Sequence, residues 1–168
     1  MINQDLYKAT LGSFPSGVTV VMAYDREGRV TGLTASAFSA LSMDPPLILV
    51  CPQYRSESYQ VLSEATHFSV NILAADQGAE AWAFAKKGAD KVAALAQLDI
   101  QQGVTGVPVL ASTVAVMECC HWRQYEGGDH AILVGEVQHM ANDSGRSPMV
   151  YCRGDMGSWP MPVIEEAC

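Results

Sequence analysis

Short runs of apolar and β-branched residues recur along the chain and predict strands. The run at 16–24 ends in the turn sequence DREG, and the extended pattern resumes at 29–36, so the two runs predict a hairpin. Pro46 and the proline before it disfavour helix and favour extended backbone ahead of the apolar run at 47–51. The other predicted strands of this character are 67–73, 114–126, 130–140 and 147–152.

Two segments carry helical patterns instead. Residues 56–65 predict a short helix with Ser56 as its N-cap. The Ala-rich residues 76–97 predict two short helices that are broken at Gly88, with Asp90 capping the second. Several short strands interrupted by two helical inserts predict a mainly β fold, a closed antiparallel barrel. No repeat, linker or change of composition divides the chain, so we expect a single domain over residues 1–168.

Composition narrows the class of protein. Charged residues make up 17% of the chain, below the ~25% typical of soluble domains, while 49% are hydrophobic, so we expect self-association to cover apolar surface. A net charge of -8 and the lack of a basic run argue against nucleic-acid binding. The apolar runs are far shorter than the roughly 20 residues of a membrane span, and the N-terminus does not resemble a signal peptide. We therefore expect a cytoplasmic protein without a membrane segment.

The five cysteines are odd in number and lack CxxC spacing, so we expect free thiols, three or four of them buried in strands. A metal site formed by cysteines and histidines is tested by the hairpin register. If Gly127 and Gly128 form the loop, Tyr125 pairs with His130. His121 then lies roughly 13 Å away from His130 along the strands, at about 3.3 Å per residue, which is too far for one metal ion. We expect no metal site.

Motifs for nucleotide phosphates (GxGxxG, GxxxxGK[ST]) and the GxSxG elbow do not occur. Small polar residues instead mark residues 32–50, where Thr34, Ser36 and Ser39 lie among small apolar residues. Their hydroxyls either bond locally to the backbone of an irregular strand edge or line the pocket of a flat, polar-edged ligand. The pattern leaves both interpretations open.

Residues near the start of the first predicted helix suggest a phosphate site. Arg55, Ser56 and Ser58 lie where free N–H groups and the helix dipole attract an anion, although an N-cap beside a solvated arginine is the commoner case. Lys91, in the second Ala-rich helix, either adds a cation or is a surface lysine. His130, at the start of a strand, has four possible roles: catalysis, metal binding, ligand contact, or a place in the turn.

In this order the segments resemble the flavin reductase-like family over residues 9–155. The specific part of the match is "TASAF" with "DPPL", together with "GDH" and "GEV" further on, and "FPSGVTVV", "FSVNIL", "FAKKGADK" and "PMVYCRG" add to it. The resemblance implies an antiparallel Greek-key split β-barrel of the FMN-binding type. It also implies hydride transfer from NADH or NADPH to FMN or FAD, a homodimer, and a partner monooxygenase that receives the reduced flavin.

The resemblance also implies site residues. The block from Thr34 to Ala37 would lie along the flavin ring and ribityl chain, the segment from Cys51 to Ser58 would run towards the phosphate, and Lys91 would reach that phosphate. His130 would lie beside the nicotinamide as the candidate catalytic residue. The full predicted set is Thr34, Ala35, Ser36, Ala37, Cys51, Pro52, Gln53, Arg55, Ser56, Ser58, Lys91, Asp129 and His130.

Departures and alternatives remain. Many relatives carry an arginine or an aromatic residue near the start, where this chain has "LYKATLG". The tail after Cys152 is unlike the usual ending, which puts tail contacts across a dimer in doubt. The alternatives are a non-catalytic flavin-binding electron carrier or store and a flavin-dependent oxidase on the same barrel. A remoter one is a haem-binding barrel with His67, His121 or His139 as axial ligand.

Overall fold

Seven antiparallel strands form the main sheet of the computed structural model, which describes residues 2–158. They are β2 (Thr19–Tyr24), β3 (Val30–Ala35), β4 (Phe38–Met43), β5 (Pro46–Val50), β6 (His67–Ile72), β9 (Ala115–Gly127) and β10 (His130–Asn142). Their order across the sheet is β3-β2-β6-β9-β10-β5-β4. The two edge strands, β3 and β4, are therefore consecutive in the chain.

The link between these edge strands gives the sheet its shape. Only Ser36 and Ala37 separate the end of β3 from the start of β4, and so short a link spans roughly 10 Å at ~3.3–3.6 Å per residue. The sheet must curl until its two edges approach each other at this point. Within residues 2–158, β3 and β4 form no ladder with each other. The prediction of a split barrel is confirmed, whereas the expectation of a closed one is wrong.

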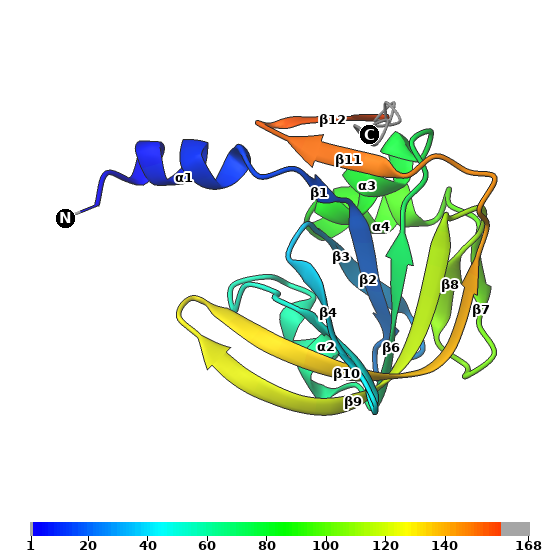
Figure 1. Cartoon of the computed structure of the whole chain (residues 1–168). Coiled ribbons are helices and arrows are strands. Elements are labelled where there is room, and N and C mark those ends of the chain that lie inside the picture. The colour runs from blue at the N-terminus through cyan, green and yellow to red at the C-terminus, as the bar shows by residue number, and fades with distance from the viewer. Residues whose placement is uncertain (1, 159–168) are drawn as a thin grey trace, which may run out of the picture.

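Two smaller sheets flank the barrel (Figure 1). One has the order β1-β11-β12, formed by β1 (Ser16–Gly17), β11 (Met149–Cys152) and β12 (Asp155–Ser158). The other is the hairpin of β7 (Ile100–Gln102) and β8 (Pro108–Leu110). The predicted strand at 147–152 corresponds to β11, while β4, β7, β8 and β12 were not predicted as strands.

Four helices complete the described part: α1 (Gln4–Gly12), α2 (Tyr59–Glu64), α3 (Gly78–Ala85) and α4 (Gly88–Leu95). The prediction of Ser56 as an N-cap is wrong, because α2 begins at Tyr59 and Ser56 Oγ accepts the N–H of Ser58 within the preceding turn at 3.3 Å. The break at Gly88 is confirmed. Asp90 does not cap α4 but lies in its first turn, since Gly88 with φ +55 leads the chain directly into the helix.

The β9–β10 hairpin has a different register from the predicted one. Gly127 pairs with His130, so the loop consists of Gly128 and Asp129. A II′ loop takes glycine at its first position, and Gly128 with φ +74 fills it. A bulge then pairs His121 with Gly135, about 17 Å along the strand from His130 at ~3.3 Å per residue. In the part of the chain that the structure describes, no three His, Cys, Asp or Glu side chains are placed to hold a metal ion.

Strand β2 is buried on both faces and divides the core in two. Val21 packs with Phe68, Cys119 and Leu133 inside the curled sheet, where α2 inserts the fully buried Leu62. The second cluster, on the other face of β2, packs under α3 and β11, with Met22, Leu73, Phe84 and Met149. None of the described helices is long and apolar enough to span a membrane.

Cys119 alone among the described cysteines is buried, so the prediction of three or four buried thiols is wrong. Strand alternation turns the neighbouring Cys120 to the other face of β9, and Cys51 and Cys152 lie at strand ends. All four are free thiols, as predicted. Cys168 lies outside the described residues.

Candidate active site

A cleft of about 560 Å³ lies where the split in the barrel meets the helical insert. One wall is the end of β3 with the Ser36–Ala37 link, a second is the segment that follows β5, and the third is the α3–α4 pair. Predicted site residues that line it are Thr34, Ala35, Ser36, Ala37, Cys51, Pro52, Gln53, Arg55, Ser56, Lys91 and His130. Lining residues that were not predicted are Leu33, Glu57, Phe84, Ala85, Lys86 and Lys87.

Backbone hydrogen bonds fix the walls to one another. The N–H of Cys51 donates to Ala37 O at 3.0 Å, which joins the segment after β5 to the link between the sheet edges. The N–H of Ala131 donates to Pro52 O at 3.0 Å, and Gln53 forms a bridge with His130. The tip of the β9–β10 hairpin is thereby held against the cleft, about 80 residues further along the chain than the wall it touches.

Hydroxyl groups in this region differ in what they offer a ligand. Thr34 lines the cleft, but its hydroxyl donates to Ala81 O at 2.5 Å and so fastens β3 to α3. Ser39 lies outside the cleft lining and donates to Ala40 O, which is the local backbone bond that the sequence left open as one interpretation. Ser36 lies on the short link and lines the cleft. Ala35, Ser36 and Ala37, which form this wall, all have small side chains.

Ser58 does not line the cleft, which corrects its placement among the phosphate contacts. The side chain is fully buried just before α2, and its Oγ donates to Gly32 O in β3 at 2.5 Å. The same Oγ accepts from Lys91 Nζ at 3.1 Å. Ser58 thus lies behind the wall and holds Lys91.

Among the cations that line the cleft, Lys91 makes two hydrogen bonds to the protein and Arg55 makes one. Lys91 Nζ donates to Gly32 O at 2.6 Å as well as to Ser58, and the half-buried side chain still lines the cleft. Burial lowers the pKa of Lys91, and the nearby Glu57 partly opposes that shift. Burial likewise raises the pKa of the Cys51 thiol in the opposite wall.

His130 is oriented by its neighbour in the hairpin loop. Nδ1 lies 2.7 Å from Asp129 Oδ1, and this hydrogen bond is the main reason why the pKa of Asp129 is lowered. Asp129 is exposed and does not line the cleft, so its place is beside the histidine, not beside a ligand. With Nδ1 engaged, Nε2 is the ring nitrogen that a ligand can reach.

Positive charge converges on the cleft although the chain is acidic overall. Arg55 comes from one wall and Lys86, Lys87 and Lys91 from the helical insert, while Glu57 is the acidic residue of the lining. Among residues 2–158 none of these four cations has a carboxylate within ion-pair distance, whereas Arg26, Arg29 and Arg146 are paired elsewhere. A cleft of this kind in a chain of charge -8 suits an anionic ligand.

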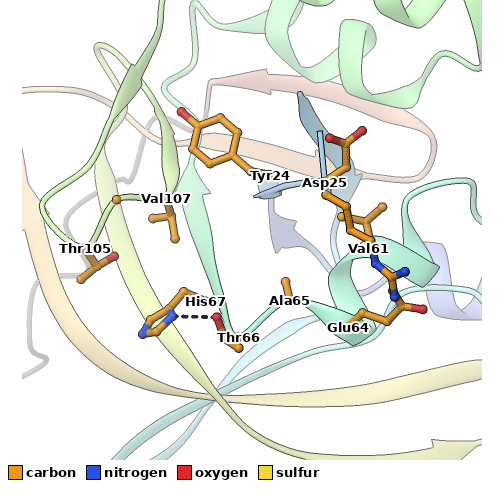
Figure 2. Close-up of a pocket in the computed structure, with 11 residues that line it drawn as sticks. Tyr24, Asp25, Val61, Glu64, Ala65, Thr66, His67, Thr105 and Val107 are labelled. Atoms are coloured by element: carbon orange, nitrogen blue, oxygen red, sulfur yellow. Dashed lines mark hydrogen bonds and ion pairs between the residues drawn. The ribbon is translucent and has the colours of Figure 1, made fainter. Parts of the chain in front are cut away.

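A second hollow of about 400 Å³ lies at the far end of the barrel, lined by residues of the β2–β3 turn, α2 and the β7–β8 loop (Figure 2). His67, one of the haem-ligand candidates, lies at its edge and bonds Thr66 at 3.1 Å. Tyr24 and Val107 face each other across one side of it. None of the predicted flavin residues lines this hollow.

A split barrel whose edges meet at a cleft lined by small residues and four cations can hold a ligand that joins a ring to a phosphate, as a flavin nucleotide does. Residues 11–160 match the family model described as flavin reductase like domain, and the chain belongs to that family. It is an oxidoreductase, a flavin reductase by family membership.

Three relatives illustrate the match. The FMN reductase (NADH) SmoA of Agrobacterium fabrum is 38% identical over 155 residues, which are 92% of this chain and 86% of that protein. The reductase component of 4-nitrophenol 4-monooxygenase/4-nitrocatechol 2-monooxygenase from Rhodococcus opacus is 38% identical over 90% of this chain and 78% of its own. The solved NADH:FAD oxidoreductase of Streptomyces globisporus, in complex with NAD and FAD fragments, superposes with a TM-score of 0.88 at 32% identity, covering 97% and 96% of the two chains.

Proposed function

We propose that the protein reduces FMN or FAD with NADH in the cleft and passes the reduced flavin to a separate monooxygenase. The observation that carries this is the set of four cations without carboxylate partners, in the described part of the chain, around a wall of small residues. A flavin nucleotide combines a flat ring with an anionic phosphate, so it matches both features. Relatives that are reductase components of monooxygenases support the partner.

The wall of Ala35, Ser36 and Ala37 supports the ring system. Hydride transfer between stacked rings requires reacting atoms about 3–3.5 Å apart, and side chains of this size leave room for that approach. The flavin, when bound, supplies the redox chemistry, while the protein supplies orientation and electrostatics. No side chain has to remove a proton in the hydride step.

The phosphate is assigned to Arg55, Ser56 and Lys91. Arg55 and Ser56 lie on the segment after β5, and Lys91 faces them from α4. Ser58, behind the wall, is a positioning residue for Lys91. These roles are proposals that rest on the geometry of the cleft and on the family.

His130 is proposed to contact the nicotinamide. It lines the cleft from the hairpin tip, and the bond to Asp129 fixes its ring. His130→Ala is expected to raise the KM for NADH about tenfold, the value of one hydrogen bond plus ring contact, and to change the flavin dissociation constant less than threefold. His67→Ala, at the second hollow, is the matched control.

Initial rates of NADH oxidation with added FMN or FAD test the activity, and fluorescence titration measures flavin affinity. Flavin binding without flavin-dependent NADH oxidation would refute the reductase and favour the non-catalytic flavin carrier. A fall in flavin affinity with unchanged NADH kinetics in His130→Ala would refute the assignment of His130.

A second copy of the chain is proposed to cover α1 and β4. Helix α1 projects from the barrel as an arm (Figure 1), buries none of its own residues, and exposes Leu6 and Leu11. The edge strand β4 exposes Leu41 and Met43, the latter to 93%. Exposed apolar residues on an arm and on an unpaired edge are features that a homodimer buries.

Sedimentation measures this association. We expect the wild type to sediment as a dimer, Leu6→Glu with Leu11→Glu to shift it towards monomer, and Val104→Glu, in the exposed β7–β8 loop, to leave it unchanged. A monomeric wild type at micromolar concentration would exclude the dimer. A cytoplasmic location is part of the same proposal, and it is supported by the four free thiols, which persist in a reducing compartment.

A further inference from the structure

Two lysines of the α3–α4 turn line the cleft and are not among the residues assigned to the flavin phosphate. Lys86 follows α3 and Lys87 precedes α4, both with extended backbone and both exposed. A single surface lysine is usually only solvated. Two adjacent lysines at the mouth of a cleft that already holds Lys91 and Arg55 concentrate positive potential on one place.

The fold holds this turn in position. The N–H of Gly88 donates to Glu57 Oε2 at 3.0 Å, and Gly88 takes the φ of +55 that the turn requires. Lys91, in the first turn of α4, is anchored to Gly32 O at 2.6 Å. The carboxylate of Glu57 is thereby engaged with the backbone, and the lysines stay over the cleft.

The four cations of the cleft carry more positive charge than one phosphate needs to be neutralised. The phosphate of FMN carries about -1.5 to -2 charges, as a phosphate monoester does at neutral pH, and Arg55 with Lys91 can match it. Hydride transfer brings two nucleotides into one cleft, and a dinucleotide carries a further phosphate. We propose, resting on the function above, that Lys86 and Lys87 form a second phosphate subsite for the pyrophosphate of a dinucleotide, carried by FAD or by the reduced nicotinamide.

The test uses the full-length protein with Lys86→Gln and Lys87→Gln combined. The matched control is Arg26→Gln with Arg29→Gln, which removes two exposed cations from the turn at the other end of β3. KM values are measured for FMN, FAD and NADH, and dissociation constants for the same three by fluorescence titration. Each constant is compared with that of the wild type.

If the subsite serves the flavin, the KM for FAD rises about tenfold, the value of a lost charge-assisted hydrogen bond, while the KM for FMN stays within twofold. If it serves the nicotinamide, the KM for NADH rises about tenfold with either flavin. FAD and NADH constants both within twofold of wild type overturn the proposal, and so does an equal rise for FMN and FAD with NADH unchanged. A wild type without turnover would refute the reductase activity alone, since the titrations still decide the subsite.

Discussion

Replacing Lys91 by Met separates its two contacts, one with the fold and one with a ligand. Met keeps the length and apolar stem of the side chain but removes the ammonium group. In the wild type Nζ donates to Gly32 O at 2.6 Å and to Ser58 Oγ at 3.1 Å, which leaves a third proton for the phosphate in the cleft. The substitution should therefore affect both stability and flavin affinity, by different amounts.

The magnitudes follow from these contacts. A hydrogen bond to a charged group contributes about 1.5–3 kcal/mol, so the loss of the phosphate contact should weaken FMN binding about 10- to 100-fold. The stability loss should be only about 1 kcal/mol, because Gly32 O still accepts from Ser58 Oγ at 2.5 Å.

Riboflavin, which carries no phosphate, supplies the internal control. Fluorescence titration should show a loss of affinity for FMN and little change for riboflavin in Lys91→Met, and Lys91→Arg should recover much of the FMN affinity. Because the pKa of Lys91 is lowered from 10.5, the charge and the FMN affinity should be lost as pH rises, at a pH below that value. An equal loss for riboflavin and FMN would show that Lys91 acts only through the fold, and unchanged FMN affinity would place the phosphate elsewhere.

Three further predictions concern the barrel. Glu118 is only 2% exposed, and its carboxylate accepts the N–H groups of Val104 and Thr105. In Glu118→Gln the amide can accept only part of this set. Urea denaturation at pH 7 should therefore show the free energy of unfolding reduced by about 2–4 kcal/mol. Burial raises the pKa of Glu118, but the hydrogen bonds lower it more, so the net pKa lies below 4.5. The carboxylate therefore stabilises the fold above that pH. The difference in unfolding free energy between wild type and Glu118→Gln should shrink as pH falls through the pKa of the folded state. Gly135→Ala would place a Cβ 2.6 Å from Phe68 Cζ, and thermal unfolding should show a loss of about 1–3 kcal/mol; a wild-type Tm would contradict the packing. Burial raises the pKa of Cys119 to about 12, so mass spectrometry should find it unmodified by iodoacetamide at pH 8 in the native protein, and rapid labelling would contradict its burial.

Apolar patterning predicted the strands that build the core. Runs such as 16–24 and 67–73 combine β-branched residues with turn signals, and β2 and β6 lie within them. Strand β4 was missed because its residues mix serine with exposed apolar side chains, so nothing in the segment alternates cleanly. Strands β7 and β8 are three residues each, too short for a period to show. Helix α1 buries no side chain and carries no core pattern to detect.

The family motifs indicated which segments of the chain lie near the cleft, whereas the chemistry of single side chains did not show which of them face it. The block from Thr34 to Ala37 lines one cleft together with Cys51, Pro52, Gln53, Arg55 and Ser56. Ser58 was misplaced because a serine near a helix start has the same sequence signal whether its hydroxyl faces a ligand or a buried carbonyl. The three lysines between 86 and 91 were the available signal for the rest of the cation set, and only Lys91 was selected from it.

The wall proposed for the flavin ring and the lysines proposed for the phosphates belong to different parts of the fold. The wall of Ala35, Ser36 and Ala37 is fixed by the barrel itself, since the two edges meet through Ser36 and Ala37 and the Cys51 N–H donates to Ala37 O. The lysines, in contrast, come from an insert between β6 and β9. Its helix α3 packs Phe84 into the core beside Met22, while Lys86 and Lys87 are exposed on the turn that follows. Substitutions in the α3–α4 turn can therefore change which phosphate is bound without moving the wall on which we propose that the rings stack. We therefore expect substitutions of Lys86 and Lys87 to change the preference among nucleotides. Substitutions in the wall of Ala35, Ser36 and Ala37 should instead change the rate of hydride transfer.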